Sequence, residues 1–219
     1  MNILLINGSN KPLKNSLLNF FVSQKDFSLV VLVEKNNVIN ITKDNILSPD
    51  MHSKLNFYGI EFLDKTQVSL IVDKLFISYK TFSFIFYIDE DINNNQIDFS
   101  IFNIENFRTY LVNELMVKVN FFQVLLEKCK DESMKPSVIV LVPIYAQTKL
   151  IKDDIVQSIL FSSFHMLTTA IADEFIDSNI TCNGILNDDT VAETLEWIIF
   201  QNKDSIHGKL FANKQIIDW

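Results

Sequence analysis

A tyrosine and a lysine four residues apart, Tyr145 and Lys149, are the side chains in this sequence whose types and spacing most resemble a catalytic pair. They stand in PIYAQTK (143–149), directly after the apolar run SVIVLV. An ammonium beside a phenol loosens the phenolic proton, which makes the tyrosine a workable acid for carbonyl reduction, and an i, i+4 spacing would put both on one helix face. The alternative is a strand end that carries two surface residues, so the spacing alone does not decide.

Residues that could hold a metal are dispersed. The three histidines, His52, His165 and His207, fall in unrelated segments, and we expect no shared metal site from them. Cys129 and Cys182 have no C-x-x-C spacing, so the sequence indicates neither a zinc site nor a disulfide framework. The acidic stretch DEDINNNQID (89–98) lacks the flanking helices and the terminal glutamate of a calcium-binding loop, which favours a solvated loop.

Composition limits what these residues could do. A chain of 219 residues that is 48% hydrophobic is long enough for one sizeable core, and we predict a single domain over residues 1–219. Nineteen basic against 27 acidic residues give a net charge of −8, which argues against a nucleic-acid surface and against anionic lipid. MNILLING is interpreted as a buried strand rather than a signal peptide, and no run reaches membrane-span length. We expect a cytoplasmic protein.

Strand-like and helix-like segments alternate along the chain. Continuous apolar runs predict strands, and apolar residues at helical spacing predict helices. The expected strands are 2–7, 27–35, 56–64, 82–89, 137–144, 179–186 and 208–218; the expected helices are 13–25, 66–79, 104–130, 153–178 and 188–202. Because parallel strands need crossover helices, this alternation predicts a Rossmann-like, doubly wound parallel sheet of six to seven strands in a three-layer α/β/α domain.

Several segments, taken in order, resemble the short-chain dehydrogenase/reductase family over nearly the whole chain. LTTAIADEFIDSNITCNGI (167–185) is similar to the family's passage from a helix with an A-x-E signature to a strand. DDTVAETLEWIIFQNKDSIHGKLFANKQ is similar to its closing helix and final strand. NILLINGSNKPLKNSLLNFF resembles the strand, glycine loop and first helix, and IEFLDKTQVSLIV resembles the third strand, its terminal Asp and the next helix.

The resemblance locates the family's catalytic residues. It implies a Tyr and a Lys on the A-x-E helix, the Tyr about four turns before the Ala. Counting back from Ala172, those positions hold Gln157 and Phe161. Neither can act as the acid or the cation, because an amide releases no proton near neutral pH and a benzene ring carries no charge. Tyr145 lies 27 residues before Ala172, nearer to the family's active-site Ser, whose place is taken by Pro143 or Ile144.

A second catalytic position of the family is an Asn on the preceding helix. Asn120, or alternatively Asn113, falls there, but a lone amide supplies no proton. The Tyr145/Lys149 match is therefore misplaced for the family's chemistry, and we predict no catalytic residues at the family's positions.

The cofactor loop also departs from the family. Of its three glycines GSNKPLK keeps Gly8, while Pro12 and Lys14 stand where backbone should approach a pyrophosphate. Gly8, Ser9, Asn10, Glu34 and Asp64 are the residues that the resemblance assigns to NAD(P). Glu34 would bind a ribose hydroxyl and Asp64 would lie beside the adenine, although an ordinary strand-end acid and a helix cap account for these two equally well. We expect no bound cofactor, with weak NAD(P) binding as the alternative.

The family's long substrate-covering segment is missing after the strand at 179–186, because NGIL passes almost at once to the capped helix NDDTVAETLEW. The helical regions 104–130 and 153–178 resemble the family's dimer helices and carry Phe121, Phe122, Phe161 and Phe164. We therefore predict a non-catalytic relative, a pseudoenzyme that forms a homodimer or pairs with an active reductase. The alternative is an NAD(P)-dependent oxidoreductase of the ketoreductase type with a rearranged site at Tyr145 and Lys149 or Tyr110.

Overall fold

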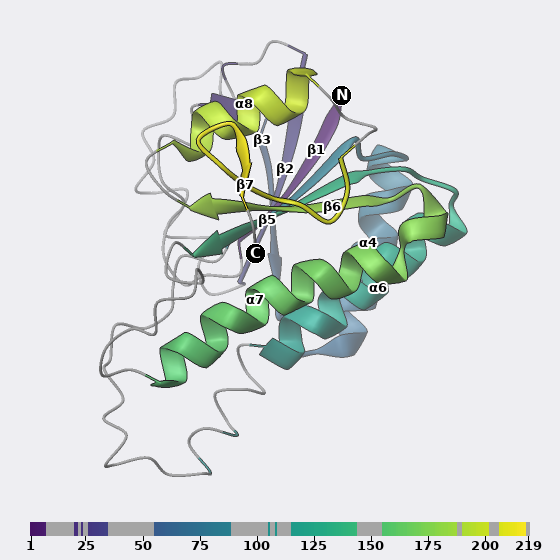
Figure 1. Ribbon diagram of the computed structural model, residues 1–219. Helices are drawn as coiled ribbons and strands as arrows, with labels where there is room; N and C mark the ends of the chain where they lie inside the picture. The colour runs from purple at the N-terminus through teal and green to yellow at the C-terminus, as the bar shows by residue number, and fades with distance from the viewer. Residues whose placement is uncertain are drawn as a thin grey trace.

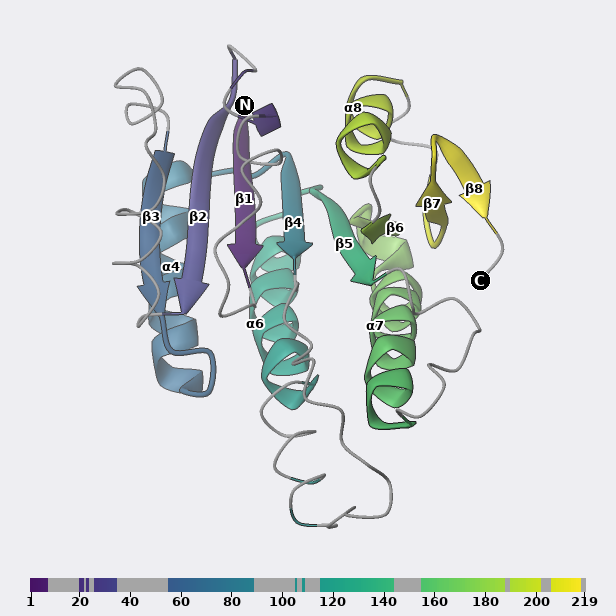
Figure 2. The ribbon, with the colours of Figure 1, turned by 90° about the vertical axis from the view of Figure 1, so that its left-hand side faces the viewer.

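The structure is a sheet sandwiched between two layers of helices (Figure 1). It is a computed structural model that describes residues 1–7, 20–21, 23, 26–34, 55–88, 105, 108, 115–143, 155–187, 190–201 and 206–217. Helices α4, α6 and α7 cover one face of the sheet and α8 covers the other (Figure 2). The predicted three-layer α/β/α architecture is confirmed.

Eight strands form one sheet in the described part of the chain, in the order β3-β2-β1-β4-β5-β6-β7-β8. The strands are β1 (Asn2–Asn7), β2 (Ser28–Glu34), β3 (Leu55–Ile60), β4 (Phe84–Ile88), β5 (Ser137–Pro143), β6 (Thr181–Asn187), β7 (Leu210–Ala212) and β8 (Gln215–Ile217). All neighbouring pairs are parallel except β7 and β8. The order reverses between β1 and β4, as in a doubly wound fold.

The α-helices in the described part of the chain are α4 (Lys65–Tyr79), α6 (Val117–Asp131), α7 (Ile155–Glu174) and α8 (Val191–Gln201). A short 3₁₀ turn, Ile176–Ser178, follows α7. Most of the predicted helix 13–25 lies outside the described residues, although residues 20–21 and 23 are helical. The other predicted elements match the observed ones within a few residues where the structure describes them.

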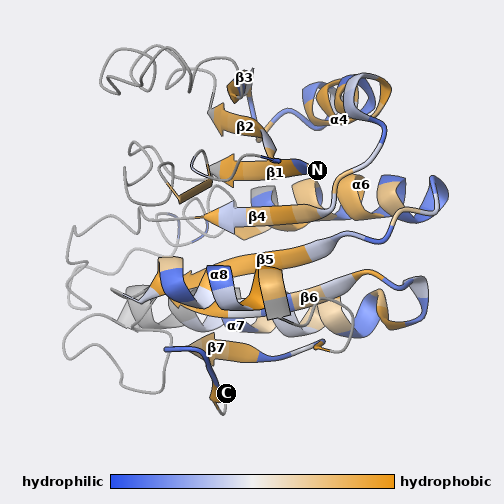
Figure 3. Ribbon diagram, turned by 90° about the horizontal axis from the view of Figure 1, so that it is seen from above, coloured by the Kyte–Doolittle hydropathy of each residue, from blue (hydrophilic) through white to orange (hydrophobic). Residues whose placement is uncertain are grey.

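Two apolar cores lie on the two faces of the sheet because side chains alternate along each strand. Leu4, Ile6 and Val30 face α4, α6 and α7, whereas Ile3, Leu5 and Val31 face α8. The strands are apolar along both faces, as Figure 3 shows for β1, β2 and β5. Such continuous burial is typical of a parallel strand covered on both sides, and it explains why the sequence predicted these strands well.

The prediction of one continuous strand over residues 208–218 is wrong. It is a hairpin of two strands, β7 and β8, joined by Asn213 and Lys214. Both turn residues have positive φ, 48° and 60°, as a two-residue hairpin turn requires. The side-chain oxygens of Thr190 and Thr194 accept hydrogen bonds of 3.2 Å from the amides of Asn213 and Lys214, so the turn is fastened to the start of α8.

The helices that the structure describes include none that is both long and apolar enough to cross a membrane.

Candidate functional site

The carboxyl edge of the sheet, where β1 and β4 diverge, is the candidate site. Asn7 ends β1 and Ile88 ends β4, and the two residues are register partners in adjacent parallel strands. Phe21, in the chain after β1, packs on one face of the sheet, whereas Phe121 of α6, after β4, packs on the other. Open α/β sheets bind ligands at the carboxyl edge where the order of the strands reverses in this way. The candidate residues can therefore be judged by how they lie relative to this edge.

Asp64 lies at this edge, after the end of β3, and it caps helix α4. Its Oδ1 accepts hydrogen bonds from the backbone amides of Thr66 at 2.9 Å and Gln67 at 3.1 Å. An aspartate in this position satisfies amides that have no partner within the helix. The capping interpretation of Asp64 is thus observed directly. Both bonds end on Oδ1, so the cap does not use Oδ2.

Glu34 is the last residue of β2 and pairs in register with Ile60 at the end of β3. Its backbone therefore lies at the carboxyl edge, on the same side of the switch point as Asp64. The two acidic residues follow neighbouring strands, which is the arrangement that the sequence implied for an adenosine-binding end.

Helix α7 begins at the carboxyl edge, because it follows β5 and runs back along the sheet to the start of β6. Gln157 and Phe161 lie on its first two turns. The helix begins ten residues after Tyr145, at Ile155, and β5 ends at Pro143. Tyr145 lies between these two elements in the sequence, outside the described residues.

A feature that the sequence analysis missed is a lysine, Lys118, in the first turn of α6. It has only 6% of its surface exposed. The next turn carries Phe121, whose ring packs 5.3 Å from Phe62, and Phe122, whose ring packs 5.1 Å from Tyr87. These contacts place the start of α6 at the carboxyl edge. From the sequence, Lys118 could have been recognised as buried only by its helical spacing with Phe121, Phe122 and Leu125. That inference needs the register of the helix to be known.

Asn120 does not lie on this buried side of α6, since its side chain is exposed. It is thus unsuited to the role of a helix-borne asparagine that faces the site. Asn113, Tyr110, Tyr145, Lys149, Gly8, Ser9 and Asn10 fall outside the described residues. In the described part of the chain, no group of three or more His, Cys, Asp or Glu residues is placed to hold a metal ion.

Asp64 has an oxygen, Oδ2, that takes no part in the cap and could accept a hydrogen bond from the adenine amino group of an adenosine. The structure describes the backbone of Glu34 and not its side chain, so its contact with a ribose hydroxyl stays a prediction. A bound nicotinamide would supply or accept hydride. The pyrophosphate end depends on the loop after β1, which the structure does not describe. Of the residues that the family resemblance assigns to NAD(P), Asp64 is therefore the one whose side chain the structure describes.

Comparison with solved structures agrees with this geometry. The carbonyl reductase Sniffer of Drosophila melanogaster superposes with a TM-score of 0.75 at 14% identity, covering 96% of both chains. ElxO with NADP bound gives a TM-score of 0.75 at 13% identity, covering 96% of this chain and 95% of that one. A short-chain type dehydrogenase/reductase from Mycobacterium marinum gives 0.69 at 12% identity, covering 90% and 78%.

The chain has the short-chain dehydrogenase/reductase fold. Its sequence matches no protein-family model and no curated protein. At such low identity the similarity concerns the fold, and a fold hosts many functions, so function must be argued from the site.

A groove runs between α6 and α7 on the outer side of the reductase fold. Its volume is about 460 Å³, and its apolar floor is formed by Phe122, Leu126, Leu167, Ile171 and Phe175. Phe121 and Phe122 are 0% and 1% exposed, so the two rings do not project from the surface as the sequence suggested. They pack in the chain's own core, and among the α7 side chains that the structure describes, the most exposed large apolar one is Met166, at 65%. The side chains of Phe161 and Phe164 are not described.

His207 has a structural role and does not lie in the candidate site. Its Nδ1 accepts a 3.1 Å hydrogen bond from the amide of Cys182, which leaves Nε2 as the donor to the Ala172 carbonyl at 2.8 Å. The imidazole thereby joins β6 to the last turn of α7. His165 lies elsewhere on α7, where burial lowers its pKa.

Proposed function

We propose that this chain is a non-catalytic member of the short-chain reductase fold, which acts in the cytoplasm by binding a partner through α6 and α7. One observation carries the proposal: the first two turns of α7, at the carboxyl edge, hold Gln157 and Phe161 where the family resemblance places its Tyr and Lys. Without an acid there, a reduced carbonyl has no source for the proton that completes the alcohol.

The short connection between β6 and α8 supports the same conclusion. β6 ends at Asn187 and α8 begins at Val191, so residues 188–190 alone separate them. A segment of this length cannot cover a substrate and exclude water from a reacting carbonyl. We keep the prediction of one domain over residues 1–219 with a shortened substrate segment.

The partner surface is the groove between α6 and α7. Beside its apolar floor, α7 exposes Met166 and Ala170, a medium-sized and a small side chain one turn apart. A groove next to a projecting side chain suits either a second copy of this chain or an active reductase with the same two helices. Met166→Glu, one turn before the groove residue Ala170, should abolish this association, whereas Ile176→Glu, at a similarly exposed residue in the turn after α7, should leave it intact.

The alternative is an NAD(P)-dependent oxidoreductase with a rearranged site. It is favoured by the acidic pair at the ends of β2 and β3 and by the NADP bound in ElxO, a protein of the same fold. Titration of NADH and NADPH by fluorescence and by thermal shift, followed by turnover assays on carbonyl compounds, separates the two functions.

We expect no turnover in these assays. Turnover that Tyr145→Phe abolishes and Tyr110→Phe spares would establish the oxidoreductase and overturn the non-catalytic proposal. Dinucleotide binding without turnover would leave the chain a non-catalytic protein that retains its ligand.

A further inference from the structure

The side chain of His207 joins segments that are distant in the sequence. Its Nδ1 accepts a hydrogen bond of 3.1 Å from the backbone amide of Cys182 in β6, and its Nε2 lies 2.8 Å from the backbone carbonyl oxygen of Ala172 in α7. The histidine itself precedes β7, which begins at Leu210. Because an amide donates and a carbonyl accepts, these two contacts require a neutral ring with its hydrogen on Nε2. The fold thus specifies one protonation state and one tautomer.

The ring satisfies backbone groups that the neighbouring elements leave over. Helix α7 ends at Glu174, so the carbonyl of Ala172 is among the last four of the helix, which have no partner within it. Cys182 turns both of its backbone groups toward the segment before β7, since its carbonyl also accepts a 2.8 Å bond from the amide of Gly208. The ring therefore prolongs the pairing of β6 with β7 and ties that pairing to the end of α7.

A proton on Nδ1 is incompatible with this arrangement. An imidazolium donates from both nitrogens and accepts at neither, so the Cys182 amide would lose its acceptor and two N–H groups would face each other. A backbone amide that loses its partner in a half-buried place is costly unless the ring turns away and water enters. The Ala172 carbonyl accepts from the neutral and from the charged ring alike. The bond from Cys182 is therefore the contact that responds to the proton.

The charged groups around the ring do not compensate for that loss. Asp173 and Glu174 on α7 and Lys209 beside the ring are exposed to solvent, where water and salt weaken their interactions. The carboxyl end of α7 attracts a positive charge, but this effect is smaller than the loss of a buried hydrogen bond. On β6 the thiol of Cys182 stays uncharged, because burial raises its pKa.

We propose that His207 is a proton-sensitive clamp: when Nδ1 takes up a proton, the ring leaves Cys182, and the start of β7 loosens from the end of α7. The opening is confined to this corner of the molecule. The other end of the hairpin is held to α8 by the hydroxyls of Thr190 and Thr194, which do not titrate.

The consequence for a partner rests on the proposed function. Ile171 and Phe175, which stand on either side of Ala172 in the sequence, form part of the floor of the groove between α6 and α7. Once the ring has left, the last turn of α7 holds these two side chains less firmly. Acid should therefore weaken binding at the groove, whereas the clamp itself exists with or without a partner.

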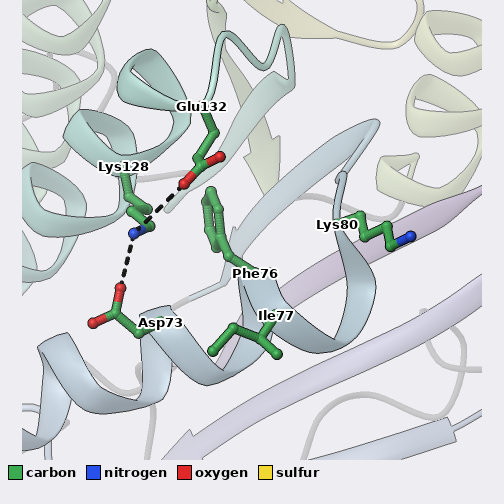
Figure 4. A pocket seen from close by; sticks show the side chains of 6 residues that line it. All are labelled: Asp73, Phe76, Ile77, Lys80, Lys128 and Glu132. Carbon is green, nitrogen blue, oxygen red and sulfur yellow. Dashed lines mark ion pairs between the residues drawn. The ribbon is translucent and has the colours of Figure 1, made fainter.

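A second cluster of charged residues lies apart from the clamp, on the α4 side of α6 (Figure 2). Figure 4 shows Lys128 between Asp73 and Glu132. The hydrogen bond to Asp73, together with the charges of both carboxylates, raises the pKa of Lys128, so this ammonium keeps its charge where histidine titrates. Carboxyl groups usually titrate near pH 4. A change between about pH 7.5 and pH 5.5 can therefore be assigned to histidine.

Hydrogen exchange at the Cys182 amide, followed by NMR on the full chain, tests the clamp. Free histidine titrates near pH 6.5, so a closed state that excludes the proton loses about tenfold in population, relative to the open state, between pH 7.5 and pH 5.5. We expect the protection factor of this amide, corrected for intrinsic exchange, to fall by about that factor. The ¹⁵N shifts of the His207 ring should show the Nε2–H tautomer at pH 7.5.

Two glutamine variants assign the effect. In His207→Gln the side chain still offers an oxygen and an N–H but does not titrate, so the protection factor should be the same at both pH values. His165→Gln, two turns earlier on α7, should keep the fall seen in the unaltered chain. An equal fall in His207→Gln, or an Nδ1–H tautomer at pH 7.5, would overturn the inference. The tautomer is measured on the unaltered chain, so it decides even if His207→Gln does not fold.

Sedimentation equilibrium at the same two pH values measures the effect on self-association. Association that weakens at pH 5.5 in the unaltered chain and not in His207→Gln would support the link between the clamp and the groove. Association that weakens equally in both proteins would refute that link. No association at either pH would count against self-association through the groove, while the exchange and tautomer measurements would still decide on the clamp.

Discussion

Asp64 can be tested for two roles separately, because the structure assigns its capping role to one oxygen. Replacing Asp64 with Ala removes the acceptor of the Thr66 and Gln67 amides at the start of α4. Replacing it with Asn keeps an oxygen in the same place and removes only the charge. The pair of variants therefore distinguishes the hydrogen bonds from the charge.

The expected magnitudes follow from the two bonds. Loss of a capping side chain costs about 1 kcal/mol of helix or protein stability. For a chain of this length, about 1 kcal/mol corresponds to a fall of roughly 2–4 °C in the melting temperature. Asp64→Asn should lose no more than the charge's interaction with the helix dipole, about 0.3–1 kcal/mol, and less in high salt.

Urea denaturation followed by circular dichroism measures the first role, and titration of NADH and NADPH measures the second. If a dinucleotide binds with its adenine beside Asp64, then Asp64→Asn weakens its affinity while it lowers the urea midpoint less than Asp64→Ala does. Equal destabilisation by the Asn and Ala variants, or none by Ala, would refute the capping account. An unchanged affinity in both variants would remove Asp64 from any cofactor site.

Three further predictions concern stability. His207→Phe leaves the Cys182 amide and the Ala172 carbonyl without partners and should cost about 2–5 kcal/mol in urea denaturation; a loss below about 0.5 kcal/mol would contradict the hydrogen-bond assignment. Lys80→Gly should raise stability by about 1 kcal/mol, because Lys80 has φ of 59° and ψ of −48°, a conformation that a side chain disfavours; a destabilised variant in thermal melts would be inconsistent with that strain. Burial raises the pKa of the Cys129 thiol from 9.0 to about 12. Since the folded chain holds this proton more tightly than the unfolded chain, the resulting stability is present below about pH 9 and is lost as pH rises toward 12, where Cys129→Ala should show a flatter profile in urea titrations.

The strands were predictable where they are buried on both faces, because such a strand has an unbroken run of apolar residues in the sequence. β1 was predicted as 2–7 and observed as Asn2–Asn7, and β5 was predicted as 137–144 and observed as Ser137–Pro143. The hairpin of β7 and β8 was missed because each strand has only three residues, and its turn, Asn213 and Lys214, contains no glycine. Such short segments carry too few alternations to separate two strands from one.

The candidate site was less predictable, since its residues acquire their roles through contacts between distant segments. The sequence left the cap and the adenine contact at Asp64 equally open; the two bonds from Thr66 and Gln67 establish the cap, and the adenine contact stays a prediction. Nothing near His207 indicates that it bridges Cys182 and Ala172, which lie 25 and 35 residues away. The burial of Phe121 and Phe122 likewise depends on the register of α6, which adjacent phenylalanines do not fix.

The fastening of the hairpin turn to α8 has a practical consequence for protein engineering. Thr190 and Thr194 hold the start of α8 against Asn213 and Lys214, and Lys214 also pairs with Glu193 at 3.0 Å. Both ends of the 188–190 connection are thus anchored, at β6 and at α8, independently of the connection's own sequence. Since lengthening a surface loop twofold costs only about 0.6 kcal/mol of closure entropy, a foreign binding peptide could be grafted here with the scaffold intact.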